Sequence, residues 1–242
     1  MSPRPYNLGR RTAATEATRE QILAAARSLL GGRGPPDEFS MEAVARKAGV
    51  ARMTVYYQFH SQAGLLEALA DDLAAKGGMQ RLREAFLAAE PDVAVRRFVG
   101  TFVGFWNSER VLMRRLRAMG VLLPGLYRGV RDRDEWRQEG ARHLLERIGV
   151  LGSSSREPER SEEVALFSSL TSFEMFDLLC DAERSPDRVA DLLSNLLLER
   201  WQLGSSAVRR LPRSPRRWHA TSAKTPSSSS AGRRRRVGPD AD

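Results

Sequence analysis

The spacing of apolar residues restricts this chain to a helical fold. Apolar side chains recur at every third or fourth position in segments such as TREQILAAARSLL and VADLLSNLLLERWQL, from about residue 16 to residue 203. This spacing gathers them on one face of a helix with about 3.6 residues per turn. No segment shows the apolar–polar alternation of a half-buried strand. We therefore predict an all-α protein.

Turn-forming and capping residues divide the chain into four predicted parts. Residues 1–14 are rich in Arg, Pro and Gly, which predicts a flexible basic arm. A helix-turn-helix domain is expected over residues 15–77 and a larger helical domain over residues 78–203. Residues 204–242 consist largely of Ser, Arg and Pro. They can bury too little apolar surface to fold, so we predict a disordered basic tail.

The positive charge of the chain lies at its two ends. The 242 residues carry a formal net charge of +9. Residues 204–242 hold ten Lys and Arg against two Asp and Glu, and residues 1–60 hold nine against five, so the middle is slightly acidic. Basic ends of this kind attract a polyanion such as nucleic acid or an anionic surface.

The same residues argue against an enzyme, a membrane protein or a secreted protein. Cys180 is the single cysteine, and the three histidines do not share the spacing of metal ligands. Phosphate-binding loops and nucleophile elbows do not occur. We predict no catalytic residue, no metal site and no cofactor. We also find no apolar run long enough for a membrane helix or a signal peptide, so a cytoplasmic protein is expected.

Residues 41–59 form the motif that points to function. MEAVARKA and RMTVYYQF are two short predicted helices joined by the turn GVA, which is the pattern of a helix-turn-helix. Ser40 is placed to cap the first helix, and Gly49 can adopt the left-handed conformation that ends it. Val55 and Phe59 are four residues apart, so they share the buried face of the second helix. The opposite face then presents donors and apolar groups suited to the major groove of DNA: Arg52, Met53, Thr54, Tyr56, Tyr57 and Gln58.

The segment from about residue 16 to residue 76 resembles the DNA-binding domain of the TetR family of bacterial repressors. The family has a Gly-Val turn, then Thr-hydrophobic-Tyr-aromatic-x-Phe, then Leu-Leu-x-Ala. These positions are matched here by Gly49, Val50, Thr54, Val55, Tyr56, Tyr57, Phe59, Leu65, Leu66 and Ala68. The resemblance implies double-stranded operator DNA as a partner, with a palindromic sequence. Ser40, Arg46 and Gln62 complete the DNA-binding residues that we predict.

Two positions depart from the family pattern. Ala51 stands where a capping Ser usually opens the recognition helix, which removes a stabilisation of about 1 kcal/mol. Gln62 stands where a Lys usually contacts phosphate; a neutral amide can still donate to phosphate but releases no counterion. The basic arm, through Arg4, Arg10 and Arg11, can compensate for the lost affinity.

The resemblance also implies that residues 80–203 bind an effector and form a homodimer. Two helices, expected over about residues 161–180 and 186–203, would pair with a second subunit, with Leu193 and Leu197 as outward apolar positions. The alternative is that their wide apolar faces are buried within one subunit. Aromatic and Met residues at helical spacing are candidates for the wall of an effector cavity or for plain core: Phe98, Phe102, Phe105, Trp106, Met113, Trp136, Phe173 and Phe176.

These inferences combine into one functional prediction. We expect a homodimeric, nucleoid-associated transcriptional regulator, acting as a repressor that a small hydrophobic effector releases from its operator. The alternatives are an architectural DNA-binding protein without a ligand, and a helical scaffold or enzyme whose helix-turn-helix is only a packing unit.

Overall fold

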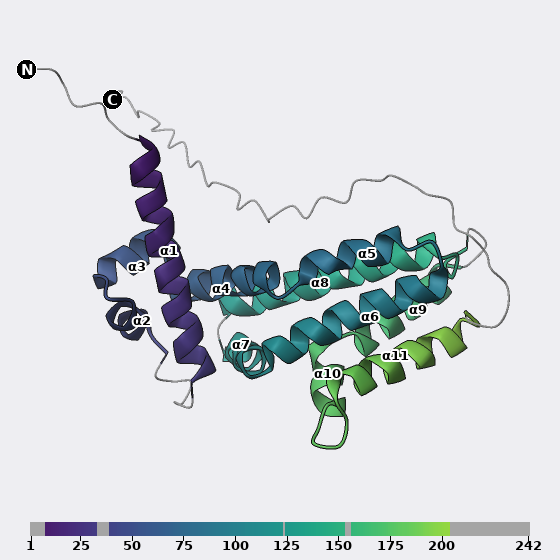
Figure 1. Cartoon of the computed structure of the whole chain (residues 1–242). Helices are drawn as coiled ribbons and strands as arrows, with labels where there is room; N and C mark the ends of the chain where they lie inside the picture. The colour runs from purple at the N-terminus through teal and green to yellow at the C-terminus, as the bar shows by residue number, and fades with distance from the viewer. Residues whose placement is uncertain (1–7, 33–38, 123, 153–155, 204–242) are drawn as a thin grey trace, which may run out of the picture. The chain divides into compact units, whose positions relative to one another are not determined.

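The computed structural model describes residues 8–32, 39–122, 124–152 and 156–203, and within these ranges every regular element is helical. This agrees with the predicted all-α class. Figure 1 shows the elements, which are α1 (Leu8–Gly31), α2 (Met41–Ala48), α3 (Arg52–Phe59), α4 (Gln62–Lys76), the short 3₁₀ helix η2 (Met79–Arg81), α5 (Leu82–Leu87), α6 (Pro91–Ser108), α7 (Arg110–Leu122), α8 (Pro124–Arg147), α9 (Glu157–Leu170), α10 (Phe173–Leu179) and α11 (Pro186–Arg200).

Local capping signals set the boundaries of the helix-turn-helix. The Ser40 side chain accepts a hydrogen bond from the backbone N–H of Ala43 at the start of α2, at 3.1 Å. Gly49 ends α2 with φ of 66°, in the left-handed region that glycine tolerates best. Ser61 caps α4 in the same way as Ser40 caps α2, through the N–H of Gly64 at 3.0 Å. The sequence therefore predicted both helices of the motif at their observed positions.

Helix α1 begins earlier than the sequence analysis predicted. It starts at Leu8, so residues 8–14 belong to a helix and not to a flexible arm. These positions lack an apolar stripe, which is why periodicity missed them. Leu, Arg and Ala are nevertheless strong helix formers, and they extend a helix that has already nucleated downstream. The rest of the predicted arm, with Arg4, and the predicted tail over residues 204–242 lie outside the described residues.

A chain of aromatic rings forms the core of the helical domain that follows α4. Helix α6 packs against α5 on one side and α11 on the other (Figure 1). Phe98 of α6 is fully buried and lies 5.0 Å from Phe102 and 4.7 Å from Phe167 of α9, measured between ring centroids. Trp106 continues the chain toward Phe173 of α10, at 5.7 Å. These contacts tie α6 to the C-terminal helices.

The helix predicted over residues 161–180 is in fact two helices. Helix α9 ends at Leu170 and α10 begins at Phe173. Two side chains stabilise the break. Ser172 caps α10 by accepting the N–H of Met175 at 3.2 Å, and the indole N–H of Trp106 donates to the carbonyl of Thr171 at 3.1 Å. This bond pairs the Thr171 carbonyl where α9 stops, so the buried polar group is satisfied.

Helix α11 buries a different face from the one that the sequence analysis predicted. Leu193 and Leu197, which were expected to face outward, are 2 % and 0 % exposed and belong to the core. The outward leucines are their neighbours Leu192 and Leu196, with 46 % and 50 % exposure. One residue along a helix turns the side chain by about 100°, so adjacent leucines face different surroundings.

Two arginines make polar contacts that join the helix-turn-helix domain to the helical domain. Arg27 of α1 pairs with Glu109, which precedes α7 and is nearly buried. Arg133 of α8 donates to the carbonyl of Glu67 at 2.9 Å and to the carboxylate of Asp71 at 2.6 Å, both on α4. The helices α1 and α4 are therefore held by charged groups as well as by apolar packing.

Candidate nucleic-acid interface

Helix α3 has one buried face and one exposed face. Val55 and Phe59 are buried, with exposures of 0 % and 4 %, as the spacing predicted. On the other face Met53 is 74 % exposed and Tyr57 is 86 % exposed, and Arg52 is also exposed. The remaining three outward candidates, Thr54, Tyr56 and Gln58, are half-buried along the edges of the helix. The side chains of Met53 and Tyr57 therefore have no role in the core and are free to contact another molecule.

Arg52 is held in place by its neighbour one turn later. Its guanidinium donates to the hydroxyl of Tyr56 at 3.3 Å and lies 5.3 Å from the centre of that ring. The hydrogen bond with Tyr56 raises the pKa of Arg52. Like any arginine, this side chain is cationic at physiological pH. An arginine at the N-terminal end of this helix is positioned to donate to a base edge or a phosphate.

The first turns of α2 and α4 border one surface hollow of about 340 Å³. Its walls include the two capping serines, Ser40 and Ser61, together with Arg52 and Tyr56 of α3. Helix N-termini carry unpaired N–H groups and partial positive charge, which suits them to bind a phosphate. Glu42 also lines the hollow and weakens this attraction, while Arg52 strengthens it.

Two of the predicted DNA-binding residues already have partners within the protein. The side-chain amide of Gln62 donates to the carbonyl of Phe39 at 2.9 Å, so it joins the start of α4 to the residue before α2. The Ser40 oxygen accepts the Ala43 N–H, yet its own hydroxyl proton can still be donated. Arg46 is exposed on α2. Ala51, as predicted, provides no side-chain cap for α3.

The comparison with protein families agrees with this geometry. Residues 22–69, from α1 into α4, match the model described as bacterial regulatory proteins, tetR family. The N-terminal domain belongs to the TetR family. The match includes both helices of the helix-turn-helix, α2 and α3, which is the DNA-binding unit of this family.

The chain is also similar to solved structures over a longer range than residues 22–69. A TetR-like transcriptional regulator from Rhodococcus sp. RHA1 is 27 % identical, with a TM-score of 0.52 over 84 % of this chain and 99 % of that chain. A protein from Saccharomonospora viridis, described as a transcriptional regulator and solved in complex with choline, is 18 % identical, with a TM-score of 0.57 over 82 % of this chain and 100 % of that chain.

A further solved structure is NalD, the secondary repressor of the MexAB-OprM multidrug efflux pump in Pseudomonas aeruginosa. It is 22 % identical to this chain, with a TM-score of 0.54 over 77 % of this chain and 96 % of NalD. No curated protein sequence matches the chain. The helical domain thus shares the fold of regulators that carry a TetR-type domain.

Most of the eight candidate effector residues lie in the core of the helical domain. Six of them, Phe98, Phe102, Phe105, Trp106, Phe173 and Phe176, are buried, and Met113 and Trp136 are half-buried. The rings largely fill the space between α6, α9 and α10 with one another. Their role as a ligand wall stays a prediction, and their packing is what a core requires.

Sequence reasoning missed a surface hollow in the helical domain. It measures about 430 Å³ and lies between α8, α9 and α10, with Arg137 and Ser168 among its walls. A signal for Arg137 was present in the sequence. It occupies the same helical stripe as Ala141, Leu144 and Ile148, all of which are buried. A charged residue on an apolar stripe is uncommon unless it has partners.

Two general features of the described residues bear on other classes of function. Each helix in these ranges is too short or too polar to cross a bilayer. The same ranges contain no cluster of three or more His, Cys, Asp or Glu side chains that could hold a metal ion.

Proposed function

We propose that this protein is a homodimeric repressor that binds a palindromic operator in the nucleoid and is released by a small-molecule effector. The observation that carries the proposal is the exposed face of α3, with Arg52, Met53 and Tyr57, in a domain of the TetR family. These side chains offer a cationic donor, a phenol and an apolar surface at one helix face. The major groove presents matching acceptors and thymine methyl groups.

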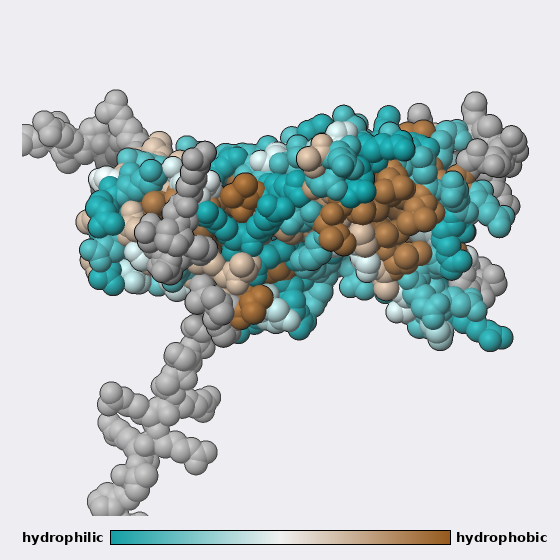
Figure 2. Space-filling model, turned by 90° about the horizontal axis from the view of Figure 1, so that it is seen from below, coloured by the Kyte–Doolittle hydropathy of each residue, from teal (hydrophilic) through white to brown (hydrophobic). Residues whose placement is uncertain are grey.

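An unpaired apolar face supports the homodimer. Figure 2, which looks at the molecule from the side where Figure 1 draws α10 and α11, shows a continuous apolar area. Leu192 and Leu196 are exposed on α11, and Leu166 is exposed on the neighbouring helix α9. The two helices are joined by the contact of Phe167 with Trp201. An exposed apolar area of this kind favours a protein partner. In a twofold dimer, a second copy buries the same area on both subunits.

A dimer would also provide more contacts to the operator than one subunit can. One eight-residue recognition helix makes few contacts, whereas two related by a twofold axis read two half-sites about one helical turn of DNA apart. The solved choline complex and the repressor NalD support the remaining parts of the proposal, because they join this fold to a small ligand and to repression in other proteins.

Selection of binding sites from random duplexes tests the proposed function. The full chain should enrich a palindromic sequence whose two halves are separated by about 10 base pairs or a multiple of that spacing. Protection of the enriched sequence from nuclease digestion should cover both halves. Enrichment of no sequence above a random pool would contradict the proposal and favour the scaffold alternative.

Substitutions on α3 separate DNA contacts from folding. We expect Arg52→Ala and Tyr57→Ala each to weaken operator binding by about 1–3 kcal/mol, because each removes contacts to bases or phosphates. Thermal unfolding should remain unchanged, since both side chains face solvent. Arg83→Ala, at an exposed arginine of α5, provides a control that also removes one positive charge. A large drop in melting temperature for either α3 variant would place that residue in the core.

The basic tail provides a second prediction. Removal of residues after Gly204 deletes ten Lys and Arg with two Asp and Glu. We expect folding, dimerisation and operator preference to remain, while affinity for random duplexes falls. Each lost phosphate contact lowers the slope of log affinity against log salt by about 0.9. Salt titrations of both proteins on operator and random duplexes measure this effect. A loss confined to the operator would mean that the tail recognises sequence.

A further inference from the structure

Helix α3 presents two apolar side chains on the side farthest from its core. Successive residues of an α-helix are turned by about 100° around its axis, so Met53 and Tyr57 lie about 160° to either side of Val55. Their exposures of 74 % and 86 % agree with this position. Arg52 and Tyr56, which contact each other, lie about 60° and 100° from Val55 and so between the buried and the outermost side. The outermost side of α3 is therefore apolar.

Met53 and Tyr57 form one surface, which we call the apolar pair of α3. Residues four apart are neighbours on the surface of a helix. Among the side chains that the structure describes, every other large apolar one that is exposed lies on α5 or a later helix, so this pair is the exposed apolar surface of the helix-turn-helix. A helix-turn-helix places its second helix in the major groove of DNA. When α3 docks in this way, the apolar pair faces the base edges.

Thymine carries the group on the base edges that matches the apolar pair. In the major groove the bases present hydrogen-bond donors and acceptors, and thymine adds the methyl group at C5. Methionine donates no hydrogen bond, and its sulfur is a weak acceptor. Against a polar base edge, Met53 would displace water and leave the base without a hydrogen-bond partner, which is unfavourable. Against a methyl group it removes apolar surface of both molecules from water, which is favourable.

The spacing of the apolar pair limits which thymines it can contact. Four residues advance a helix by about 6 Å, and successive base pairs of a DNA duplex are about 3.4 Å apart, so the pair spans about two base-pair steps. The ring of Tyr57 can lie against a methyl group while its hydroxyl remains at the rim of the contact, where water reaches it. Both members of the pair can therefore contact methyl groups within one short segment of a half-site.

We propose that Met53 and Tyr57 determine operator specificity by contact with the C5-methyl groups of thymines, within about three consecutive base pairs of each half-site. The inference rests on the proposed function, because it requires α3 to enter the major groove of an operator. It adds the chemical group on the DNA that this face of α3 recognises. The contact uses the ring of Tyr57 and not its hydroxyl.

Deoxyuridine tests the inference, because it differs from thymidine only in lacking this methyl group. Operators in which each thymidine in turn is replaced by deoxyuridine in both half-sites should be titrated with the full chain. At one or more positions the replacement should lower affinity by roughly tenfold, since two buried methyl groups are lost. The sensitive positions should lie within about three consecutive base pairs of a half-site. The same replacement in a random duplex should leave affinity unchanged.

Variants of α3 assign this sensitivity to the apolar pair. Met53→Ala and Tyr57→Ala should each bind the thymidine and deoxyuridine operators with nearly equal affinity at one sensitive position or more. Tyr57→Phe keeps the ring, so it should retain the sensitivity of the wild type. Arg52→Ala is the matched control on the same helix. It should weaken binding to both kinds of operator and keep the difference between them.

Three results would overturn the inference while the proposed function stands. The wild-type protein could bind its operator with equal affinity after replacement of any thymidine. The sensitivity could persist unchanged in either alanine variant, which would assign the methyl contact to another residue. It could also disappear in Tyr57→Phe, which would assign the contact to the hydroxyl. Absence of operator binding by the wild type would instead contradict the proposed function, and the inference with it.

Discussion

Replacing Leu192 or Leu196 with glutamate is expected to convert the protein into monomers that no longer hold their operator. Both side chains are about half exposed on the face of α11 that we propose as the dimer interface. A carboxylate buried there without a partner would lose its hydration, at a cost of several kcal/mol. Separation of the two recognition domains removes the gain from binding two half-sites at once. We therefore expect operator affinity to fall by roughly 10²–10⁴-fold.

Sedimentation and operator titration of the same variants measure this effect. Leu87→Glu provides the matched control, because Leu87 is 64 % exposed but belongs to α5. It should leave both the dimer and operator binding intact. Leu193→Ala tests a buried leucine of the same helix. Because Leu193 lies in the core, this substitution should lower the free energy of unfolding by about 2–5 kcal/mol. A wild-type protein that sediments as a monomer at micromolar concentration would refute the proposed interface.

Phe59→Ala should have the largest effect on the stability of the DNA-binding domain. Phe59 is 4 % exposed, and the guanidinium of Arg19 lies over its ring, with 4.7 Å between the guanidinium carbon and the ring centroid. Truncation of a buried phenylalanine leaves a cavity and removes apolar contacts, which lowers the free energy of unfolding by about 3–5 kcal/mol. The total free energy of unfolding of a small domain is only about 5–15 kcal/mol. We expect the helix-turn-helix to be partly unfolded and operator binding to be lost.

Chemical denaturation followed by circular dichroism measures this loss. Tyr57→Ala is the internal control, because it removes an aromatic side chain of similar size from the same helix at a position that is 86 % exposed. Its free energy of unfolding should change by less than about 0.5 kcal/mol. If Phe59→Ala and Tyr57→Ala had equal midpoints, the assignment of a buried and an exposed face to α3 would be wrong.

The sequence alone determined the features that depend on local interactions. The cap at Ser40 and the left-handed Gly49 involve residues within a few positions of one another, so capping rules predicted them. The spacing of Val55 and Phe59 predicted which face of α3 is buried. Periodicity therefore sufficed for the all-helical class and for the helix-turn-helix, although it missed the start of α1, where an apolar stripe is absent.

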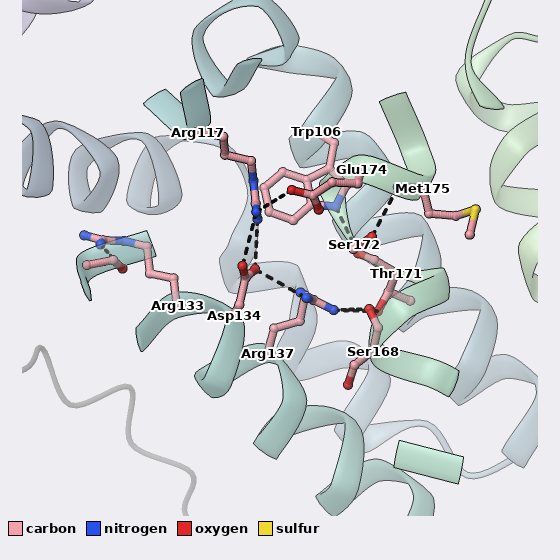
Figure 3. A network of polar contacts seen from close by, with 11 residues as sticks. Trp106, Arg117, Arg133, Asp134, Arg137, Ser168, Thr171, Ser172, Glu174 and Met175 are labelled. Carbon is pink, nitrogen blue, oxygen red and sulfur yellow. Dashed lines mark hydrogen bonds and ion pairs between the residues drawn. The ribbon is translucent and has the colours of Figure 1, made fainter. Parts of the chain in front are cut away.

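Only the tertiary structure decided which faces of the C-terminal helices are buried and where the hollow between α8, α9 and α10 lies. Because α11 contains adjacent leucines, two rotations of the helix about its axis, about 100° apart, would each bury a pair of leucines. Packing against α6 selects the rotation that buries Leu193 and Leu197. The end of α9 involves a hydrogen bond between Trp106 and Thr171, which are 65 residues apart. Arg137 and Ser168 meet for the same reason, because helices distant in sequence pack side by side (Figure 3). Contacts of this kind depend on the whole fold, so no local pattern specifies them.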